Sequence, residues 1–182
     1  MQPATPAKQY HSASIALHWL MLLLIAVAYA TMELRGYAPR GGARDFVKMI
    51  HYSVGLSIFA LVWFRLVMRF VSPTPPIEPP LTLLHRIGAW AAVVALYAFM
   101  IAMPLLGWIA LSADGKPVLF FGVPLFALAG PDKELAHFME DLHETIANIG
   151  YGLIGLHAAA ALYHHYLRRD NTLLRMAPFW RR

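Results

Sequence analysis

The sequence has no cysteine among its 182 residues. That absence excludes disulfide bonds, iron–sulfur clusters, cysteine-ligated zinc, covalently attached c-type haem and thiol catalysis. Charged side chains are also scarce: they make up 14% of the chain, against about 25% in a typical soluble domain. Because 59% of the residues are hydrophobic, a soluble monomer is not expected. Disorder, a collagen-like chain and a coiled coil are excluded by the same composition.

Four long apolar runs predict an all-α membrane protein, a four-transmembrane-helix bundle within one domain of residues 1–182. At 1.5 Å per residue, each run can cross a hydrocarbon core about 30 Å thick. The expected spans are residues 14–35, 49–71, 83–111 and 138–167. Pro104 is expected to kink the third of them.

Two shorter features are not counted as additional spans. The apolar run from Val118 to Gly130 has only 13 residues, so it is expected to lie at the membrane interface. Ala28-Tyr29-Ala30 fits a small-x-small cleavage site. The apolar run continues past it, however, so we expect the first span to be retained.

Lys and Arg residues near the span ends favour a topology with both termini cytoplasmic. The nine cations on the inner side are Lys8, Arg65, Arg69, Arg86, Arg168, Arg169, Arg175, Arg181 and Arg182. The six on the outer side are Arg35, Arg40, Arg44, Lys48, Lys116 and Lys133. This distribution accounts for the net charge of +5, so no nucleic-acid partner is expected.

The outer loop of residues 35–48 concentrates positive charge. Its four cations, opposed only by Asp45, are Arg35, Arg40, Arg44 and Lys48. They have two interpretations, contact with lipid headgroups or a cationic landing site that steers a small anion to the outer face.

The histidines carry most of the functional inference, because histidine within a membrane span is costly and usually functional. His143 and His157 are 14 residues apart, which places them about 21 Å apart on one helix face. His51 is near the outer start of the second span, and His18 is near the inner end of the first. Depth therefore predicts two pairs, His51 with His143 and His18 with His157.

Such pairs suit bis-imidazole ligation of haem iron. Zinc is the rival metal, but it usually takes three or four protein ligands in one place. Gly55 follows His51 by four residues, and Gly150 is midway between His143 and His157. Both glycines are predicted to give clearance for a flat macrocycle; the alternative is close helix–helix packing.

His164 is the alternative partner for His18. The expected depth of His18 in the membrane matches that of His157 better than that of His164. His164 and His165 are expected at the inner rim, where they either meet a haem propionate, take part in proton transfer, or simply reach the interface. The remaining histidines lie near span ends and receive no role; they are His11, His85 and His137.

Several motifs resemble the small bacterial di-haem cytochromes b561 over essentially the whole chain. They are Ile15-Ala16-Leu17-His18-Trp19-Leu20, Met49-Ile50-His51 with Gly55, Met103-Pro104-Leu105-Leu106-Gly107-Trp108, and Leu142-His143-Glu144 through Leu156-His157 to His164-His165. The tail from Arg168 to Met176 is similar to the superoxide oxidase branch of that family.

The resemblance implies two non-covalent b haems, with His18 and His157 as ligands of the inner one and His51 and His143 as ligands of the outer one. It also implies a bacterial inner-membrane protein that exchanges electrons with quinone. In the superoxide oxidase branch, superoxide would be oxidised to dioxygen at the periplasmic face and ubiquinone reduced. The outer cations would then steer superoxide, while His164 and Arg169 are candidates for contact with a propionate or the quinone.

Three functions compete on the sequence alone. The first is a superoxide:ubiquinone oxidoreductase. The second is a quinone-linked cytochrome b subunit of a larger oxidoreductase, which would need a periplasmic electron donor docked on its outer face. The third, a non-redox haem-handling protein, is disfavoured by two buried histidine pairs.

Overall fold

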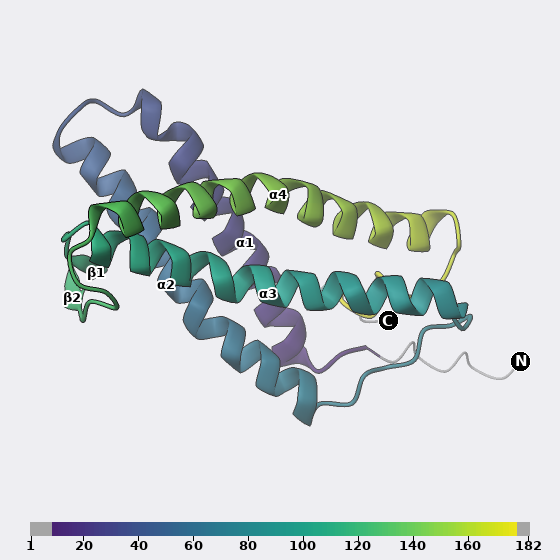
Figure 1. Ribbon diagram of the computed structural model, residues 1–182. Coiled ribbons are helices and arrows are strands. Elements are labelled where there is room, and N and C mark those ends of the chain that lie inside the picture. The colour runs from purple at the N-terminus through teal and green to yellow at the C-terminus, as the bar shows by residue number, and fades with distance from the viewer. Residues whose placement is uncertain (1–8, 178–182) are drawn as a thin grey trace, which may run out of the picture.

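The computed structural model describes residues 9–177 and is built from four long helices (Figure 1). Its elements are α1 (Ser12–Leu34), η1 (Arg35–Tyr37), α2 (Gly42–Val71), α3 (Leu83–Ala113), β1 (Val118–Phe120), β2 (Val123–Leu125) and α4 (Lys133–Tyr166). All four α-helices are long and apolar enough to cross a membrane, which confirms the predicted fold class. Lys8, Arg181 and Arg182, counted in the charge bias, lie outside the described residues.

The helices run alternately up and down, so the loops gather at two ends of the bundle (Figure 1). One end holds η1 and the β1–β2 hairpin, and we call it the outer end. The opposite end holds the start of α1, the α2–α3 connection and the segment after α4, and we call it the inner end. These two names follow the predicted topology.

Helices α2 and α4 each begin ahead of the expected membrane span. The second span was expected from residue 49 and the fourth from residue 138, but the helices begin at Gly42 and Lys133. Their first turns are polar, and hydropathy marks where a helix becomes apolar rather than where it begins. The start of α4 is fixed by Asp132, whose carboxylate accepts a hydrogen bond from the Leu135 N–H at 3.0 Å.

Residues 118–130 contain the only β structure of the described chain. Strand β1 pairs antiparallel with β2, with Val118 opposite Leu125. Phe121 and Gly122 make the turn with positive φ values of 48° and 89°, and the Phe121 N–H donates to Ser53 Oγ at 2.8 Å. The segment predicted to lie at the interface is therefore a hairpin fastened to α2.

Some pairs of helices in the bundle pack closely, and other pairs stand apart. Close contacts join α1 to α2, α2 to α3, and α3 to α4. Within the described residues, no Cα atom of α4 lies within 8 Å of one in α1 or α2. Side chains bridge that space: Tyr29 donates to the Ala147 carbonyl oxygen and Tyr151 to Glu33, each at 2.7 Å. The arrangement leaves room inside the bundle on the α4 side.

Candidate functional site

The outer histidine pair joins α2 to α4. The ring centres of His51 and His143 are 6.2 Å apart, and the rings are inclined at 73°. Each Nδ1 meets a backbone carbonyl oxygen at 2.9 Å, that of Ala28 for His51 and that of Met103 for His143. Since a carbonyl oxygen only accepts, both rings carry their proton on Nδ1. Each Nε2 therefore keeps a lone pair for a metal ion.

Gly107 allows His143 to lie against the backbone of α3. A Cβ atom at this position would stand 3.4 Å from Cε1 of His143, which is a tight contact. The imidazole can therefore approach α3 closely enough to reach the Met103 carbonyl oxygen. The sequence motif containing Gly107 was noted, but not its role beneath His143.

The inner pair joins α1 to α4 and has the same spacing. The ring centres of His18 and His157 are 6.2 Å apart, with an angle of 69° between the planes. Here the partner of His18 is a side chain: Arg65 Nη2 is 3.0 Å from its Nδ1. Arg65 Nη1 is buried and has no hydrogen-bond partner among residues 9–177. Sequence reasoning counted Arg65 only as an inner-face cation and missed this contact.

The ring spacing of both pairs fits the predicted ligation, but a guanidinium only donates, so His18 Nδ1 accepts from Arg65 and only the outer pair shows the tautomer with Nε2 free. Two imidazoles on opposite sides of one metal ion, each with a metal–nitrogen distance of about 2 Å, place their ring centres roughly 6 Å apart. The described residues contain no cluster of three or more His, Asp or Glu that could hold a metal, so they offer no conventional zinc site. At the inner pair, the free Arg65 donor suits a carboxylate such as a haem propionate.

A large cavity opens beside the outer pair. It has a volume of about 620 Å³ and is lined by His51, His143 and Gly55 among others. A Cβ added at Gly55 would meet no atom within 4 Å, as expected for a residue that leaves clearance. The space is large enough for a sizeable planar ligand.

Gly150 does not leave the open clearance that the sequence predicted. A Cβ at this position would stand 2.4 Å from the Tyr29 hydroxyl and 2.6 Å from Phe99. The absence of a side chain at Gly150 therefore makes room for Tyr29 and Phe99. The sequence shows that Gly150 is equally spaced from His143 and His157, but it does not show which neighbouring group occupies the space beside Gly150.

The predicted outer cations separate into two groups. Arg35 and Lys48 line the cavity, whereas Arg40 and Arg44 do not. Arg44 instead donates to the Ala38 carbonyl oxygen at 3.1 Å and holds the loop before α2. The cavity also has other charged lining residues. They are Lys116, Glu33, Asp114, Glu140 and Glu144.

Asp114 pairs with both Lys116 and Lys133. Hydrogen bonds from Lys116 and Lys133 lower the pKa of Asp114 to about 2, and the bond to Asp114 raises the pKa of Lys116. The Lys133 Nζ atom is 2.5 Å from Asp114 Oδ1. The cavity lining therefore combines the cations Arg35, Lys48 and Lys116 with the carboxylates of Glu33, Asp114, Glu140 and Glu144.

The other predicted residues lie away from the two pairs. His164 does not approach His18 but contacts Asp170 and His85 at the inner end. Arg169 is exposed and has a positive φ of 57° where the chain leaves α4. Two histidines without an assigned role are also placed: His137 lines the outer cavity, and His11 accepts the Ala13 N–H at the start of α1.

Known proteins resemble this chain over nearly its whole length. Residues 9–179 match the model of the prokaryotic cytochrome b561 family. Cytochrome b561 homolog 1 of Escherichia coli (strain K12) is 39% identical over 171 residues, covering 93% of this chain and 97% of the relative. The probable superoxide oxidase CybB of Yersinia pestis is 40% identical over 175 residues, covering 94% and 97%. Cytochrome b561 homolog 2 of Escherichia coli (strain K12) is 30% identical over 173 residues, covering 93% and 91%.

Proposed function

The chain belongs to the prokaryotic cytochrome b561 family of haem-binding membrane electron-transfer proteins, and we propose that it holds two b haems, one at each end of the bundle. The observation that carries this proposal is the occurrence of two histidine pairs with the same 6.2 Å ring separation. They are separated along α4 by 14 residues, or about 21 Å. When bound, each haem supplies a centre that gains and loses one electron.

We assign the iron ligands to the two pairs, His51 with His143 and His18 with His157. At the outer end, the carbonyl oxygens of Ala28 and Met103 hold both rings with Nε2 available. At the inner end, Arg65 has a buried donor free for a carboxylate. Gly55 leaves space against α2 for the outer group.

We further propose that the electron donor is superoxide, oxidised at the outer end, and that the acceptor is ubiquinone. Two superoxide ions and one ubiquinone, with two protons, give two dioxygen molecules and one ubiquinol. The support is the 40% identity to a protein named as a probable superoxide oxidase, together with Arg35 and Lys48 at the cavity. Cations lining a cleft raise the local concentration of an anion and its association rate.

The protein is a multi-pass protein of the bacterial inner membrane, and we propose that both termini are cytoplasmic. The support is the excess of cations at the inner end, as the positive-inside rule requires. With this orientation the cavity beside His51 and His143 faces the periplasm. Quinone reduction then belongs to the inner half, and the protons that it consumes come from the cytoplasmic side.

Stopped-flow spectroscopy of the oxidised, detergent-purified protein tests this function. Superoxide is expected to reduce the haems rapidly, as followed at the α band, and added ubiquinone is expected to reoxidise them. The rate of reduction should fall as ionic strength rises, because salt screens steering. If the protein holds two low-spin haems that superoxide does not reduce, the superoxide assignment is wrong. The electron-transfer subunit would then be favoured, with a periplasmic partner as donor.

A further inference from the structure

A small pocket lies at the inner end of the bundle, between the beginning of α1 and the end of α2. Its volume is about 30 Å³, which is room for about two water-sized atoms. One face of α2, together with the residue that ends it, contributes Arg65, Met68, Arg69 and Ser72. The other lining residues come from the chain around the start of α1, from α3 and from the segment after α4, and they are Tyr10, Ser14, Tyr97 and Met176.

The lining of the pocket, as far as residues 9–177 form it, has two guanidinium groups and no carboxylate. Arg65 and Arg69 are one helical turn apart, and like charges at this spacing repel each other. Within the same residues, neither arginine forms an ion pair with a carboxylate. Arg65 contacts His18, and Arg69 donates to the Thr74 hydroxyl. The outer cavity mixes cations with carboxylates, whereas this pocket has a positive charge that an anion would neutralise.

Hydroxyl groups complete the polar lining. The residues that carry them are Tyr10, Ser14, Ser72 and Tyr97. The Tyr10 oxygen accepts a hydrogen bond from Arg175 Nη2 at 3.0 Å, so the Tyr10 proton is available to another acceptor. Guanidinium groups are the strongest partners of phosphate oxygens in proteins, and hydroxyl groups add neutral donors. The donor set of the pocket therefore suits a phosphate group.

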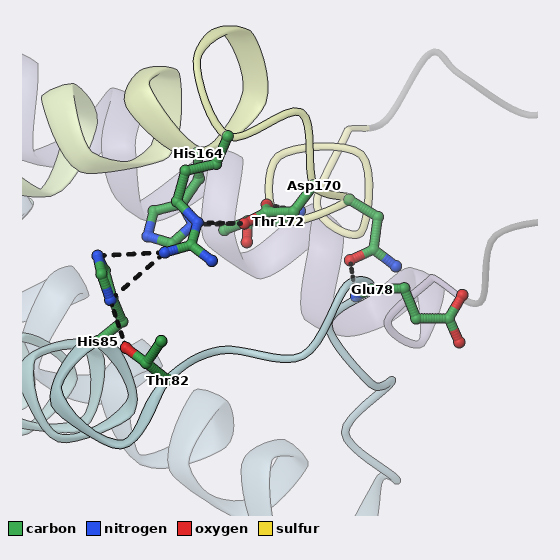
Figure 2. Close-up of polar contacts among 8 residues, drawn as sticks. Glu78, Thr82, His85, His164, Asp170 and Thr172 are labelled. Atoms are coloured by element: carbon green, nitrogen blue, oxygen red, sulfur yellow. Dashed lines mark hydrogen bonds and ion pairs between the residues drawn. The ribbon is translucent and has the colours of Figure 1, made fainter.

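The segment after α4 holds one wall of the pocket in place. The Met176 carbonyl oxygen accepts a hydrogen bond from Trp19 Nε1 of α1 at 2.8 Å. Earlier in the segment, Asp170 is only 3% exposed, and its carboxylate meets His164 Nδ1 at 2.5 Å and the Thr172 N–H at 2.9 Å (Figure 2). The segment is therefore fastened to both α1 and α4, and the pocket is already formed without a ligand.

The pocket lies at the depth of lipid headgroups. Helix α2 has 30 residues and is about 45 Å long, which matches a bilayer of 40–45 Å with its headgroups. Arg65 and Arg69 are about 9 and 3 Å from the inner end of this helix, so they bracket the level of the phosphates.

The surface of α2 beside the pocket is apolar. Its exposed side chains around Met68 and Arg69 are Phe64, Val67, Phe70 and Val71. In a membrane-spanning helix, exposed side chains of this kind contact acyl chains. Cationic groups and an acyl-chain surface are therefore adjacent, as a phospholipid requires.

We propose that this pocket binds the phosphodiester group of an anionic phospholipid from the leaflet at the inner end. Room for about two atoms suits the two non-bridging oxygens of a phosphodiester better than the four oxygens of a free phosphate ion. Arg65 and Arg69 supply the positive charge, and the acyl chains lie along the apolar surface of α2. Basic pockets between membrane helices bind lipid headgroups in this way. The site requires neither haem nor quinone and goes beyond the proposed function.

Native mass spectrometry of the delipidated holoprotein tests the site. The probes are dioleoyl phosphatidylglycerol, dioleoyl phosphatidylcholine, dioleoylglycerol and inorganic phosphate. One phosphatidylglycerol per chain should bind about tenfold more tightly than phosphatidylcholine, whose choline group already balances its phosphate. Dioleoylglycerol, which has no phosphate, should not be retained, and excess inorganic phosphate should not displace the lipid.

Variants then locate the binding site. Arg69→Gln should weaken phosphatidylglycerol binding about fivefold, as for loss of one cation at a membrane surface, and Arg69→Lys should retain most of the binding. Arg86→Gln removes the same charge at the start of α3, outside the pocket, and should bind as the wild type does. The haem absorption spectrum checks that each variant is folded. Arg65 is kept, because it also contacts His18.

Three outcomes would overturn the proposal. Equal retention of phosphatidylglycerol and dioleoylglycerol would show that only acyl chains are recognised. Displacement of the lipid by inorganic phosphate would show a site for a free ion. Equal losses in Arg69→Gln and Arg86→Gln would show an effect of overall charge. Haem content and reduction by superoxide test the proposed function separately, so either proposal can fail while the other stands.

Discussion

The outer and inner histidine pairs have the same ring separation but differ in what holds the rings. At the outer end, both Nδ1 atoms meet backbone carbonyl oxygens. At the inner end, Nδ1 of His18 faces the Arg65 guanidinium, which carries a full positive charge. Hydrogen bonds to a carbonyl oxygen make a ligand more electron-donating, whereas a nearby cation favours addition of an electron. The difference predicts that electrons move downhill from the outer site to the inner one.

The surroundings of the two pairs also differ. The outer pair opens on a cavity of about 620 Å³ whose lining holds Arg35 and Lys48 together with several carboxylates. The inner end holds a buried carboxylate and two further histidines within a network of hydrogen bonds. The outer end therefore opens on a cavity, whereas hydrogen bonds around a buried carboxylate hold the inner end together.

Removing one histidine from either pair should have the largest effect on the difference between the two ends. His51→Ala is expected to lose the outer haem and all superoxide-driven reduction. His18→Ala is expected to lose the inner haem, keep superoxide-driven reduction of the remaining one, and lose reoxidation by quinone. Haem content per chain and stopped-flow rates measure both effects. Identical defects in the two variants would contradict the division of roles.

Replacing the inner cation tests whether Arg65 sets the difference between the sites. Arg65→Gln should lower the inner reduction potential, because a unit charge several ångströms away contributes about 2 kcal/mol, or roughly 100 mV. Spectroelectrochemical titration should show the outer potential nearly unchanged. Arg69→Gln, one helical turn further along α2, is the matched control and should have a smaller effect. Equal shifts in both variants would argue against a specific role for Arg65.

We expect steering of the anion to depend on where a cation lies on the protein, and not on the net charge of the protein. Lys48→Glu should slow reduction by superoxide about tenfold at low ionic strength and much less at high salt. Arg86→Glu makes the same charge change at the start of α3, at the inner end, and should leave that rate unchanged. If the two variants behave alike, steering by the outer cavity is wrong.

The buried carboxylate of the inner end should contribute to stability in a pH-dependent way. Because the pKa of Asp170 is lowered in the folded protein, its contribution is present above the unfolded pKa of about 3.9 and is lost as pH falls below it. Asp170→Asn should lower the free energy of unfolding in detergent by about 1–2 kcal/mol at neutral pH. The difference should shrink below about pH 4. The exposed outer Asp141, replaced by Asn, should change stability by less than about 0.5 kcal/mol.

The sequence was sufficient for the spans and for the proximity of the histidines in each pair. Hydropathy locates apolar helices, and the depth of a histidine follows from its position along a span. The polar first turns of α2 and α4 lie ahead of the expected spans, because hydropathy marks only the apolar part of a helix. The β1–β2 hairpin was missed because an apolar run of 13 residues does not reveal that a turn at Gly122 folds it back on itself.

Contacts between distant segments were beyond prediction from the sequence. Arg65 and His18 are 47 positions apart, and their contact depends on how α1 and α2 are rotated about their axes. The meeting of His85 with His164 and Asp170 depends in addition on the irregular chain after α4. Gly150 shows the same limit, since small residues leave space for cofactors and for side chains such as Phe99 alike.

Haem content measured together with the low-spin spectrum tests the central claim most directly. Purified wild-type protein should contain two haem b per chain, and the double variant His51→Ala with His143→Ala should contain one. The haem that remains should keep a bis-histidine spectrum and the higher of the two reduction potentials. A wild-type protein with one haem, or a double variant that still holds two, would contradict the assignment of one haem to each end.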